Sequence, residues 1–542
     1  MNVAAAVGQA LVRAGIDHVF GVVGSGNFHV TNAMVAEGAR FVAARHEGGA
    51  TTMADAYARV SGRVAAVTVH QGCGLTNTMT GLAEAAKSRT PLVVVAAEAT
   101  DPRSNFYVDQ PALAHAVGAL SLRVDSAADA TTRAVEAVTL AVTTRRTVLL
   151  NLPLSVQAEE CPDANPVDPV RATDGAAPEA AEVERLAEAV RAAQRPVFVA
   201  GRGARAFGGE LREVAERAGA LLAESAVAKD LFHDDDWSLG VSGGFASPTA
   251  AELIGGADLI VGWGCALNMW TTRDGRLIAP GATVVQVDDT PDALGAQRAL
   301  TFGVLGDVGH TARALTDQLP EVRQGYRTGQ VRRDLAAGTR WRDVPYDDLT
   351  GDGLIDPRTL TTLLDDLLPR ERIVAVDSGN FMGYPAMFLE TPDEQGFCFT
   401  QAYQSIGLGL ATAIGAALAR PDRLPVAALG DGGALMSASE LETVVRLGLP
   451  MLVVVYDDHA YGAEVHHFAP DGAPLDTVVF PDTDIASIAR GFGFEAATVR
   501  GVGDLTAVGE WLDAGPTGPF LVDAKVVDAE PSWWLEEAFR GH

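Results

Sequence analysis

The most constraining feature of the sequence is the stretch from residue 424 to residue 462, which joins two apolar runs through a glycine-rich turn and a helix. The two runs, Leu424–Leu429 and Met451–Tyr456, have the length and composition of buried strands. Between them, the glycines of Gly430–Gly433 let the backbone turn sharply and approach a ligand closely. Since strand–helix–strand crossovers are right-handed, the stretch predicts two parallel strands in one sheet.

The helix of this crossover has a recognisable start. Ser437 and Glu440 have the S-x-x-E spacing of a capping box, in which each side chain bonds a backbone N–H of the first turn. We therefore expect a helix to open there and to bury an apolar face that includes Leu441 and Val444.

Two acidic residues flank the predicted strands. Asp431 follows the first strand and Asp458 follows the second, so both are expected at the ligand-binding edge of an open parallel sheet. Two carboxylates beside a glycine turn suit a hard cation such as Mg²⁺ that also holds a diphosphate. An ordinary crossover without a ligand is the alternative interpretation of these residues taken alone.

The charge balance excludes one class of partner. The chain has 41 lysine and arginine residues against 70 acidic ones, a formal charge of −29, and offers no basic stripe for a nucleic-acid backbone. A well-solvated acidic surface explains the excess without further function.

Targeting and cysteine signals are also absent from the sequence. The N-terminus lacks the pattern of a signal peptide, and no apolar run approaches the ~18 residues of a membrane helix. We therefore expect a cytoplasmic protein that binds neither membrane nor nucleic acid. The four cysteines have no C-x-x-C spacing, which indicates neither a zinc site nor a disulfide framework; they are Cys73, Cys161, Cys265 and Cys398.

Alternating strand and helix patterns occur in three blocks of the 542-residue chain, which predicts three doubly wound parallel-sheet α/β domains. We place the domains at residues 1–160, 180–320 and 355–530. A segment rich in Pro, Ala and acidic residues at 156–182 is expected to be a linker. A polar segment at 316–354 is expected to be a second, irregular connector.

The third block resembles the diphosphate-binding domain of thiamine diphosphate (ThDP) enzymes. Gly-Asp-Gly, the acidic pair Asp457–Asp458 and a following Tyr-Gly match that family's motif, in which the pair is usually Asn-Asn. The resemblance implies that Asp431, Asp458 and the backbone carbonyl of Ala460 bind Mg²⁺. The additional carboxylate is compatible with the metal, because Mg²⁺ prefers carboxylate at least as much as amide oxygen. The resemblance also assigns cofactor contacts to Gly430, Gly432, Gly433 and Tyr461.

The three blocks in order resemble the pyrimidine-binding, central and diphosphate-binding domains of ThDP-dependent 2-oxoacid decarboxylases and acetolactate synthases. Within the first block, Arg45-His46-Glu47 precedes a predicted helix at Gly49–Arg59 and resembles the family's catalytic glutamate motif. This implies that Glu47 hydrogen-bonds the cofactor's aminopyrimidine ring and promotes its imino tautomer. A charge favoured by the helix dipole is the alternative role for Glu47.

Residues after two other strands of the first block are candidates for substrate contacts and proton transfer. Ser25 lies in a glycine turn, and His70 and Gln71 follow the strand Ala65–Val69. Ser25 with His70 resembles the pairing in benzoylformate decarboxylase, whereas acetolactate synthases usually have T-S-G-P-G in the His70 region. A neutral imidazole at this edge can shuttle protons near neutral pH, although His70 could instead only close a turn. Gln110 resembles the glutamine region of synthases and lyases and is a further substrate contact.

The third block offers further candidates. Ile406 aligns with the bulky residue that wedges between the two cofactor rings, with an ordinary core isoleucine as the alternative. Glu464 lies where pyruvate decarboxylases carry a catalytic glutamate. His466 and His467 follow it, but their spacing fits no zinc motif, and a surface helix face is expected for at least one of them.

The central block has one glycine loop, at residues 201–208, that follows a predicted strand. Acetolactate synthases bind FAD in this domain, while related decarboxylases do not. Because the loop lacks a convincing acidic ribose partner, we expect no FAD.

Taken together, the resemblance implies a ThDP- and Mg²⁺-dependent lyase or transferase. It would decarboxylate a 2-oxo acid and release an aldehyde, or join the remaining fragment to a second carbonyl compound to form an acyloin. The expected assembly is a homodimer or homotetramer with the active site at the subunit interface. Acetolactate synthase activity is the first alternative, and a non-catalytic ThDP-binding regulatory subunit is the second.

Overall fold

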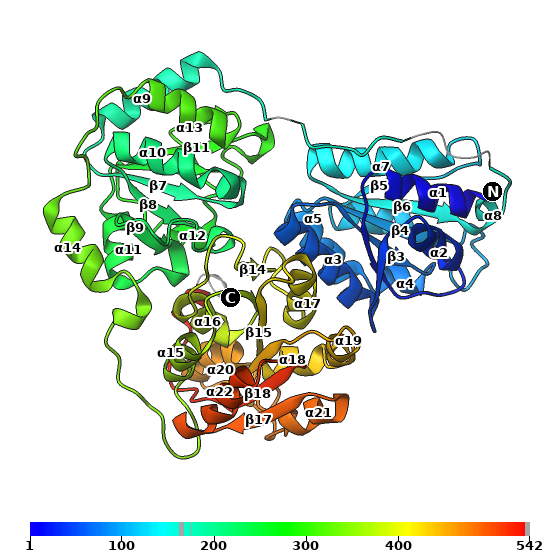
Figure 1. The fold of residues 1–542 in the computed structure, drawn as a ribbon. Helices are drawn as coiled ribbons and strands as arrows, with labels where there is room; N and C mark the ends of the chain where they lie inside the picture. The colour runs from blue at the N-terminus through cyan, green and yellow to red at the C-terminus, as the bar shows by residue number, and fades with distance from the viewer. Residues whose placement is uncertain (162–166, 174, 537–542) are drawn as a thin grey trace.

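The computed structural model describes residues 1–161, 167–173 and 175–536, and these residues form three lobes that each contain a six-stranded parallel sheet (Figure 1). The expected class of three doubly wound α/β domains is confirmed. No helix in this part of the chain combines the length and apolar character needed to cross a membrane.

The N-terminal sheet has the strand order β2-β1-β3-β4-β6-β5. Its strands are β1 (His18–Gly21), β2 (Arg40–Ala43), β3 (Ala65–Val69), β4 (Leu92–Glu98), β5 (Leu120–Arg123) and β6 (Thr147–Pro153). Its helices are α1 (Val3–Arg13), α2 (Phe28–Ala36), α3 (Glu47–Ser61), α4 (Cys73–Thr76), α5 (Met79–Lys87), α6 (Gln110–Ala116), α7 (Ala130–Thr144) and α8 (Leu154–Gln157). The central strands β3, β4 and β6 are buried along their whole length, as expected for a parallel sheet covered on both faces.

The middle sheet has a different order, β12-β11-β10-β7-β8-β9, which changes direction between β7 and β10. Its strands are β7 (Pro196–Ala200), β8 (Leu221–Glu224), β9 (Ser238–Val241), β10 (Leu259–Trp263), β11 (Thr283–Asp288) and β12 (Phe302–Leu305). Its helices are α9 (Ala180–Ala192), α10 (Gly208–Ala218), α11 (Pro248–Gly255), α12 (Met269–Thr272), α13 (Val308–Asp317) and α14 (Gly329–Gly338).

The C-terminal sheet repeats the N-terminal order as β14-β13-β15-β16-β18-β17. Its strands are β13 (Arg372–Val376), β14 (Phe397–Phe399), β15 (Leu424–Gly430), β16 (Leu452–Asp457), β17 (Glu495–Val499) and β18 (Phe520–Lys525). Its helices are α15 (Pro357–Leu367), α16 (Gly383–Phe388), α17 (Gly409–Ala419), α18 (Asp431–Met436), α19 (Glu440–Arg446), α20 (Gly462–Phe468), α21 (Ile485–Phe492) and α22 (Thr506–Asp513).

The N-terminal and C-terminal lobes share one hydrophobic core, although they are far apart in sequence. Helix α3 packs against α17, side by side in Figure 1, and Met53, Leu410 and Ile414 are fully buried in the same apolar cluster. The helices approach closely because α17 carries a glycine at the contact: a Cβ on Gly415 would lie 2.1 Å from the Met53 carbonyl oxygen. The start of α3 is therefore held against the C-terminal lobe.

Two local expectations are wrong. The predicted capping box does not form, because Ser437 donates to the Gly433 carbonyl (2.8 Å) while Glu440 accepts N–H groups of the N-terminal lobe. Residues 431–436 are already helical, as α18. The segment 316–354 is not wholly irregular either, since it contains α14, which buries Val331 and Leu335 against α11.

Candidate active site

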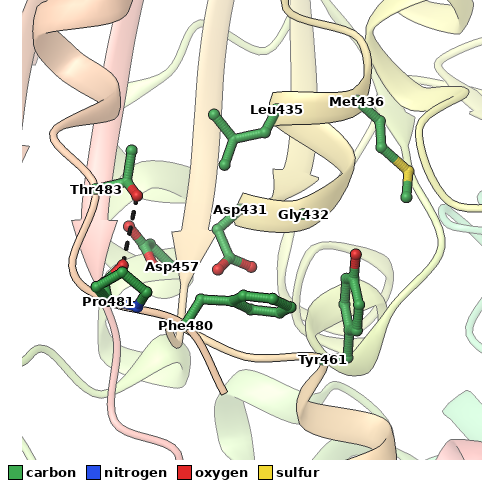
Figure 2. A pocket seen from close by; sticks show the side chains of 9 residues that line it. All are labelled: Asp431, Gly432, Leu435, Met436, Asp457, Tyr461, Phe480, Pro481 and Thr483. Carbon is green, nitrogen blue, oxygen red and sulfur yellow. Dashed lines mark hydrogen bonds between the residues drawn. The ribbon is translucent and has the colours of Figure 1, made fainter. Parts of the chain in front are cut away.

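A cavity of about 290 Å³ opens at the carboxyl ends of β15 and β16, where the sequence predicts the metal site. Figure 2 shows the Asp431 carboxylate and the rings of Tyr461 and Phe480 pointing into it. The cavity is lined by Asp431, Gly432, Leu435, Met436, Asp457, Tyr461, Phe480, Pro481 and Thr483. The two rings meet edge to face with centroids 5.0 Å apart and form one wall.

Three carboxylates crowd this edge of the sheet. Burial and the charge of Asp457 raise the pKa of Asp431 to about 6. Burial and the charge of Asp431 raise the pKa of Asp458 well above its ordinary value. Like charges held together in a water-poor site raise each other's pKa, and a bound cation would relieve this repulsion. The arrangement therefore suits a divalent metal ion.

The loop after Asp458 has the features of a tight ligand cradle. His459 adopts a left-handed backbone conformation (φ +58°), and the Asp458 side chain accepts the Ala460 N–H (3.2 Å). A Cβ on Gly462 would lie 2.3 Å from Asp458 Oδ2, so the close approach of α20 to this carboxylate requires glycine. The same Cβ would lie 3.0 Å from the Asn380 side-chain nitrogen.

The donor set fits Mg²⁺ together with a polar ligand. Asp431, Asp458 and the Ala460 carbonyl are all oxygen donors, which Mg²⁺ prefers. The side-chain oxygen of Asn380 is buried without a hydrogen-bond partner in the described structure, close to Gly462, and is an additional polar group for a ligand to satisfy. Sequence reasoning missed Asn380, whose only local signal is its place just after β13.

Glu47 is the first residue of α3 and is half-buried. Its Oε2 accepts a hydrogen bond from the Asn77 side chain (3.0 Å). The backbone before it is held by Glu440 of α19, whose Oε1 accepts the N–H groups of Arg45 and His46, each at 3.0 Å. A buried carboxylate of the C-terminal lobe thus orients the start of α3 and with it Glu47.

Ser25 and His70 form a hydrogen-bonded pair. Ser25 Oγ lies 3.3 Å from His70 Nε2, and His70 Nδ1 lies 3.0 Å from the Gln71 carbonyl oxygen. Because a carbonyl only accepts, a neutral His70 carries its proton on Nδ1, and Nε2 accepts from the Ser25 hydroxyl. The Phe106 ring stands edge-on to the imidazole, with centroids 5.2 Å apart. The pair provides a proton acceptor at an exposed turn.

The two glutamines of the first lobe have different surroundings. Gln71 is buried, and its side-chain oxygen has no hydrogen-bond partner among the described residues. Gln110 is also buried, but its amide bonds the Asn151 side chain (2.9 Å) and the Gly72 N–H (3.4 Å). Gln110 therefore supports the loop that follows His70.

Ile406 lies half-buried in the loop between β14 and α17. The loop is held by Asp377, whose fully buried carboxylate accepts the N–H groups of Gly407 (2.9 Å) and Leu408 (3.2 Å). Burial raises the pKa of Asp377 to about 6. Sequence reasoning missed Asp377, because its partners lie 30 positions further along the chain.

Glu464, His466 and His467 lie on α20. His466 Nε2 lies 2.5 Å from Asp528 Oδ1, so this histidine is held by a carboxylate. The His467 ring packs edge-on against Phe468. Glu464 is half-buried in the first turn of the helix.

The predicted residues form two groups. Asp431, Asp457 and Tyr461 lie around the cavity of the C-terminal lobe, with Asp458 beside them. Ser25, His70 and Gln71 form the second group in the N-terminal lobe. Within the described chain, no hydrogen bond links the two groups directly.

Family models for the thiamine pyrophosphate (TPP, the same compound as ThDP) enzymes match three regions. The "Thiamine pyrophosphate enzyme, N-terminal TPP binding domain" matches residues 1–117, the central domain residues 183–315 and the C-terminal TPP binding domain residues 377–524.

Similar curated proteins span nearly the whole chain. An acetolactate synthase large subunit of Parasynechococcus marenigrum is 28% identical, over 92% of this chain and 83% of that protein. A sulfoacetaldehyde acetyltransferase of Alcaligenes xylosoxydans xylosoxydans is 28% identical, over 84% and 81%. A probable 2-ketoarginine decarboxylase of Pseudomonas aeruginosa is 28% identical, over 94% and 91%.

Among solved structures, the ThDP-dependent 4-hydroxybenzoylformate decarboxylase of Rhodococcus jostii RHA1 has the same fold. The TM-score is 0.81 at 21% sequence identity, over 98% of this chain and 100% of that one.

Proposed function

This chain belongs to the thiamine pyrophosphate enzyme family, and from this premise we propose that it is a ThDP- and Mg²⁺-dependent enzyme that decarboxylates a 2-oxo acid. The observation that carries the proposal is the pair of carboxylates Asp431 and Asp458, whose pKa values are raised by burial and by the neighbouring acids, beside a cavity at the sheet edge. When bound, ThDP supplies a nucleophilic carbon and an electron sink for the cleavage of a bond next to a carbonyl.

The residues of the C-terminal lobe hold and shape the cofactor in this proposal. Asp431, Asp458 and the Ala460 carbonyl would hold Mg²⁺, whose positive charge would favour the diphosphate of the cofactor. Gly430, Gly432, Gly433 and Tyr461 would contact the cofactor, and Ile406 would pack against it. Asp377 fixes the Ile406 loop through the N–H groups of Gly407 and Leu408.

Residues of both lobes move protons. Glu47 would hydrogen-bond the aminopyrimidine ring of the cofactor and hold the proton at that bond, and Glu440 keeps Glu47 in place by accepting the preceding N–H groups. Without substrate, His70 Nε2 accepts from the Ser25 hydroxyl. With substrate bound, that hydroxyl would donate to the substrate carboxylate instead, which leaves Nε2 free to take or return a proton at the substrate. Glu464 is a second proton-transfer residue, and Gln71 and Gln110 complete the substrate side.

Carboligation is the second candidate activity. It is favoured by the relatives named acetolactate synthase, one of which, isozyme 2 of Escherichia coli, matches 99% of this chain and 97% of its own length at 27% identity. Both activities begin with the same decarboxylation and differ in whether a proton or a second carbonyl compound completes the reaction.

The middle lobe is proposed to bind no flavin. The loops after β7 and β10 touch at the point where the strand order changes direction, with Gly203 N donating to the Gly264 carbonyl (3.1 Å). A Cβ on Gly201 would lie 2.2 Å from the same carbonyl oxygen, which leaves a dinucleotide little room. Purified protein that carries flavin absorbance would overturn this assignment.

We also propose that the active site forms between two copies of the chain, as a homodimer or homotetramer. Exposed apolar side chains occur near both groups of site residues, including Phe28 (51% exposed) in the N-terminal lobe and Met436 (58% exposed) at the cavity. Light scattering on the purified protein tests this, and a stable monomer that retains full activity would exclude it.

The central experiment supplies purified protein with ThDP and Mg²⁺ and measures CO₂ release from pyruvate and from benzoylformate. Glu47→Gln is the test variant, and Glu188→Gln, on the exposed face of α9, is the matched control. Products are separated into aldehydes and acyloins to distinguish the two activities. Cofactor binding without turnover of any 2-oxo acid would support a regulatory subunit instead.

A further inference from the structure

Asp457 is a third acid at the metal edge, and its carboxylate is almost fully buried, with a side-chain exposure of 1%. An unpaired buried carboxylate is strongly destabilising, so Asp457 needs a compensating positive group. One Mg²⁺ on Asp431 and Asp458 would leave that requirement unmet.

The compensating group is Lys525, the last residue of β18, whose Cα is paired with that of Asp457 in the register of β16 and β18. Its ammonium lies 2.5 Å from Asp457 Oδ2, 2.8 Å from Asp482 Oδ1 and 3.2 Å from Asp523 Oδ1. It also donates to the Thr483 carbonyl (2.9 Å). The lysine side chain is itself 1% exposed.

These contacts place the ammonium where a second cation would otherwise fit. Asp457, His459 and Asp482 each offer a ligand atom, and those atoms lie within 4.8 Å of one another, a separation suited to a metal ion. His459 Nε2 lies 3.5 Å from Asp457 and 3.3 Å from Asp482. Lys525 bonds both of these acids and therefore occupies the electrostatic position of that ion.

Lys525 also joins the metal loop to the cavity wall. Asp457 Oδ1 accepts the His459 N–H (3.1 Å), and the Phe480 N–H donates to the His459 carbonyl (2.7 Å). Asp482 and Thr483 lie on the same segment as Phe480, which lines the cavity. The buried Lys525 ammonium thus binds both the metal loop, through Asp457, and the cavity wall, through Asp482 and Thr483.

We propose that Lys525 is a positioning residue that acts as a built-in second cation. Its ammonium neutralises Asp457 and keeps a divalent ion out of the Asp457–His459–Asp482 cluster. The site therefore takes a single Mg²⁺, on Asp431 and Asp458. The inference rests on the proposed function for the first ion. It also explains how the chain accommodates aspartate where related enzymes usually have asparagine.

The test counts Mn²⁺ ions bound per chain in the presence of ThDP, by electron paramagnetic resonance, and measures the thermal midpoint without metal or cofactor. Mn²⁺ serves as the probe because it shares the oxygen ligands of Mg²⁺. The wild type should bind one ion. Lys525→Met should bind two and should lose roughly 10 °C of thermal midpoint, because buried carboxylates lose their partner.

Matched variants separate charge from packing. Asp457→Asn with Lys525→Met should bind one ion and recover part of the lost thermal midpoint, and Lys525→Arg should bind one ion. Lys229→Met removes another buried lysine, which pairs with Asp230 (2.6 Å) away from the cavity, and should lower the midpoint while leaving one ion bound.

The outcomes are distinct. A wild type that binds no Mn²⁺ with ThDP would overturn the proposed function. A wild type and a Lys525→Met variant that both bind one ion would overturn only the role of Lys525. If neither Lys525→Met nor the double variant folds, the loss of packing outweighs the loss of charge, and the inference is wrong.

Discussion

The N-terminal and C-terminal lobes repeat one strand order and yet carry opposite chemistry at the same edge. Glu47 follows the edge strand β2 and begins α3, while Ile406 follows the edge strand β14 and precedes α17. His70 follows β3 and Asp431 follows β15, which occupy matching places in the two sheets. The shared topology determines where side chains gather, and the residue types determine what they do there.

The difference between the lobes lies in charge and burial. In the N-terminal lobe, Ser25, His70 and Glu47 are exposed or half-buried and bond neutral partners. In the C-terminal lobe, Asp431 and Asp458 repel one another in a water-poor site that favours a cation. We infer that the N-terminal lobe is suited chiefly to proton transfer and that the C-terminal lobe, apart from Glu464, is suited to anchoring a charged cofactor.

The largest expected effect separates chemistry from cofactor binding. Glu47→Gln should lower CO₂ release about 10³-fold, since the amide cannot exchange the proton that the carboxylate does. Calorimetric affinity for ThDP with Mg²⁺ should remain near that of the wild type. A variant that loses cofactor affinity in proportion to activity would contradict the division between the lobes.

Asp458→Ala should produce the opposite pattern. Loss of one carboxylate ligand should weaken Mg²⁺ binding about 10²-fold, and saturating Mg²⁺ should restore part of the activity. Titration of activity with Mg²⁺ checks this, with the exposed Asp471→Ala as control. If saturating metal restores nothing, Asp458 has a role beyond ligation.

The pH dependence of stability should differ between metal-free and metal-loaded protein. Asp431 and Asp377 have pKa values of about 6, above the ordinary value of 3.8, so the folded state binds their protons more tightly than the unfolded state. Their contribution to metal-free stability is present below about pH 4 and is lost as the pH rises through about 6, by about 3 kcal/mol for each group.

Mg²⁺ should offset the Asp431 part of this loss, because the ion replaces the proton there. The gain in thermal midpoint on adding Mg²⁺ and ThDP should therefore increase between about pH 5 and about pH 7. Differential scanning fluorimetry measures it. A gain that is constant with pH would show that metal binding displaces no proton at this edge.

The smallest effect concerns the Ser25–His70 pair. Ser25→Ala removes the hydroxyl that donates to His70 Nε2 and should lower the decarboxylation rate about 3- to 10-fold, as expected for one hydrogen bond. Ser25→Thr, which keeps the hydroxyl, is the control. Equal losses in both variants would point to the shape of the turn.

The sequence alone was sufficient for the fold class and for much of the strand pattern, because apolar runs between glycine turns are local signals. The expected strand Ala65–Val69 matches β3, and the run Leu424–Leu429 lies within β15. The edge strands β5, β9, β12, β14 and β17 were missed, since they are only three to five residues long and β5 and β17 are largely half-exposed, which leaves little hydrophobic pattern.

Parts of the site depend on contacts that no local pattern encodes. In the sequence, Glu440 matches a capping motif. In the structure it bonds N–H groups nearly 400 positions away, so the tertiary contact replaces the expected cap. Lys525 meets Asp457 only through strand pairing across 68 positions. Asp377 meets the Ile406 loop because its carboxylate accepts the Gly407 N–H, 30 positions further along the chain.

The core shared by α3 and α17 has a consequence for how the molecule unfolds. Because the N-terminal and C-terminal lobes bury one apolar cluster in common, we expect them to unfold as one cooperative unit, whereas the middle lobe has clusters of its own. The middle lobe is therefore inserted in the chain between the N-terminal and C-terminal lobes, which pack directly against each other. Heating should melt those halves together, and a break in the chain near residue 174 should leave the two fragments associated.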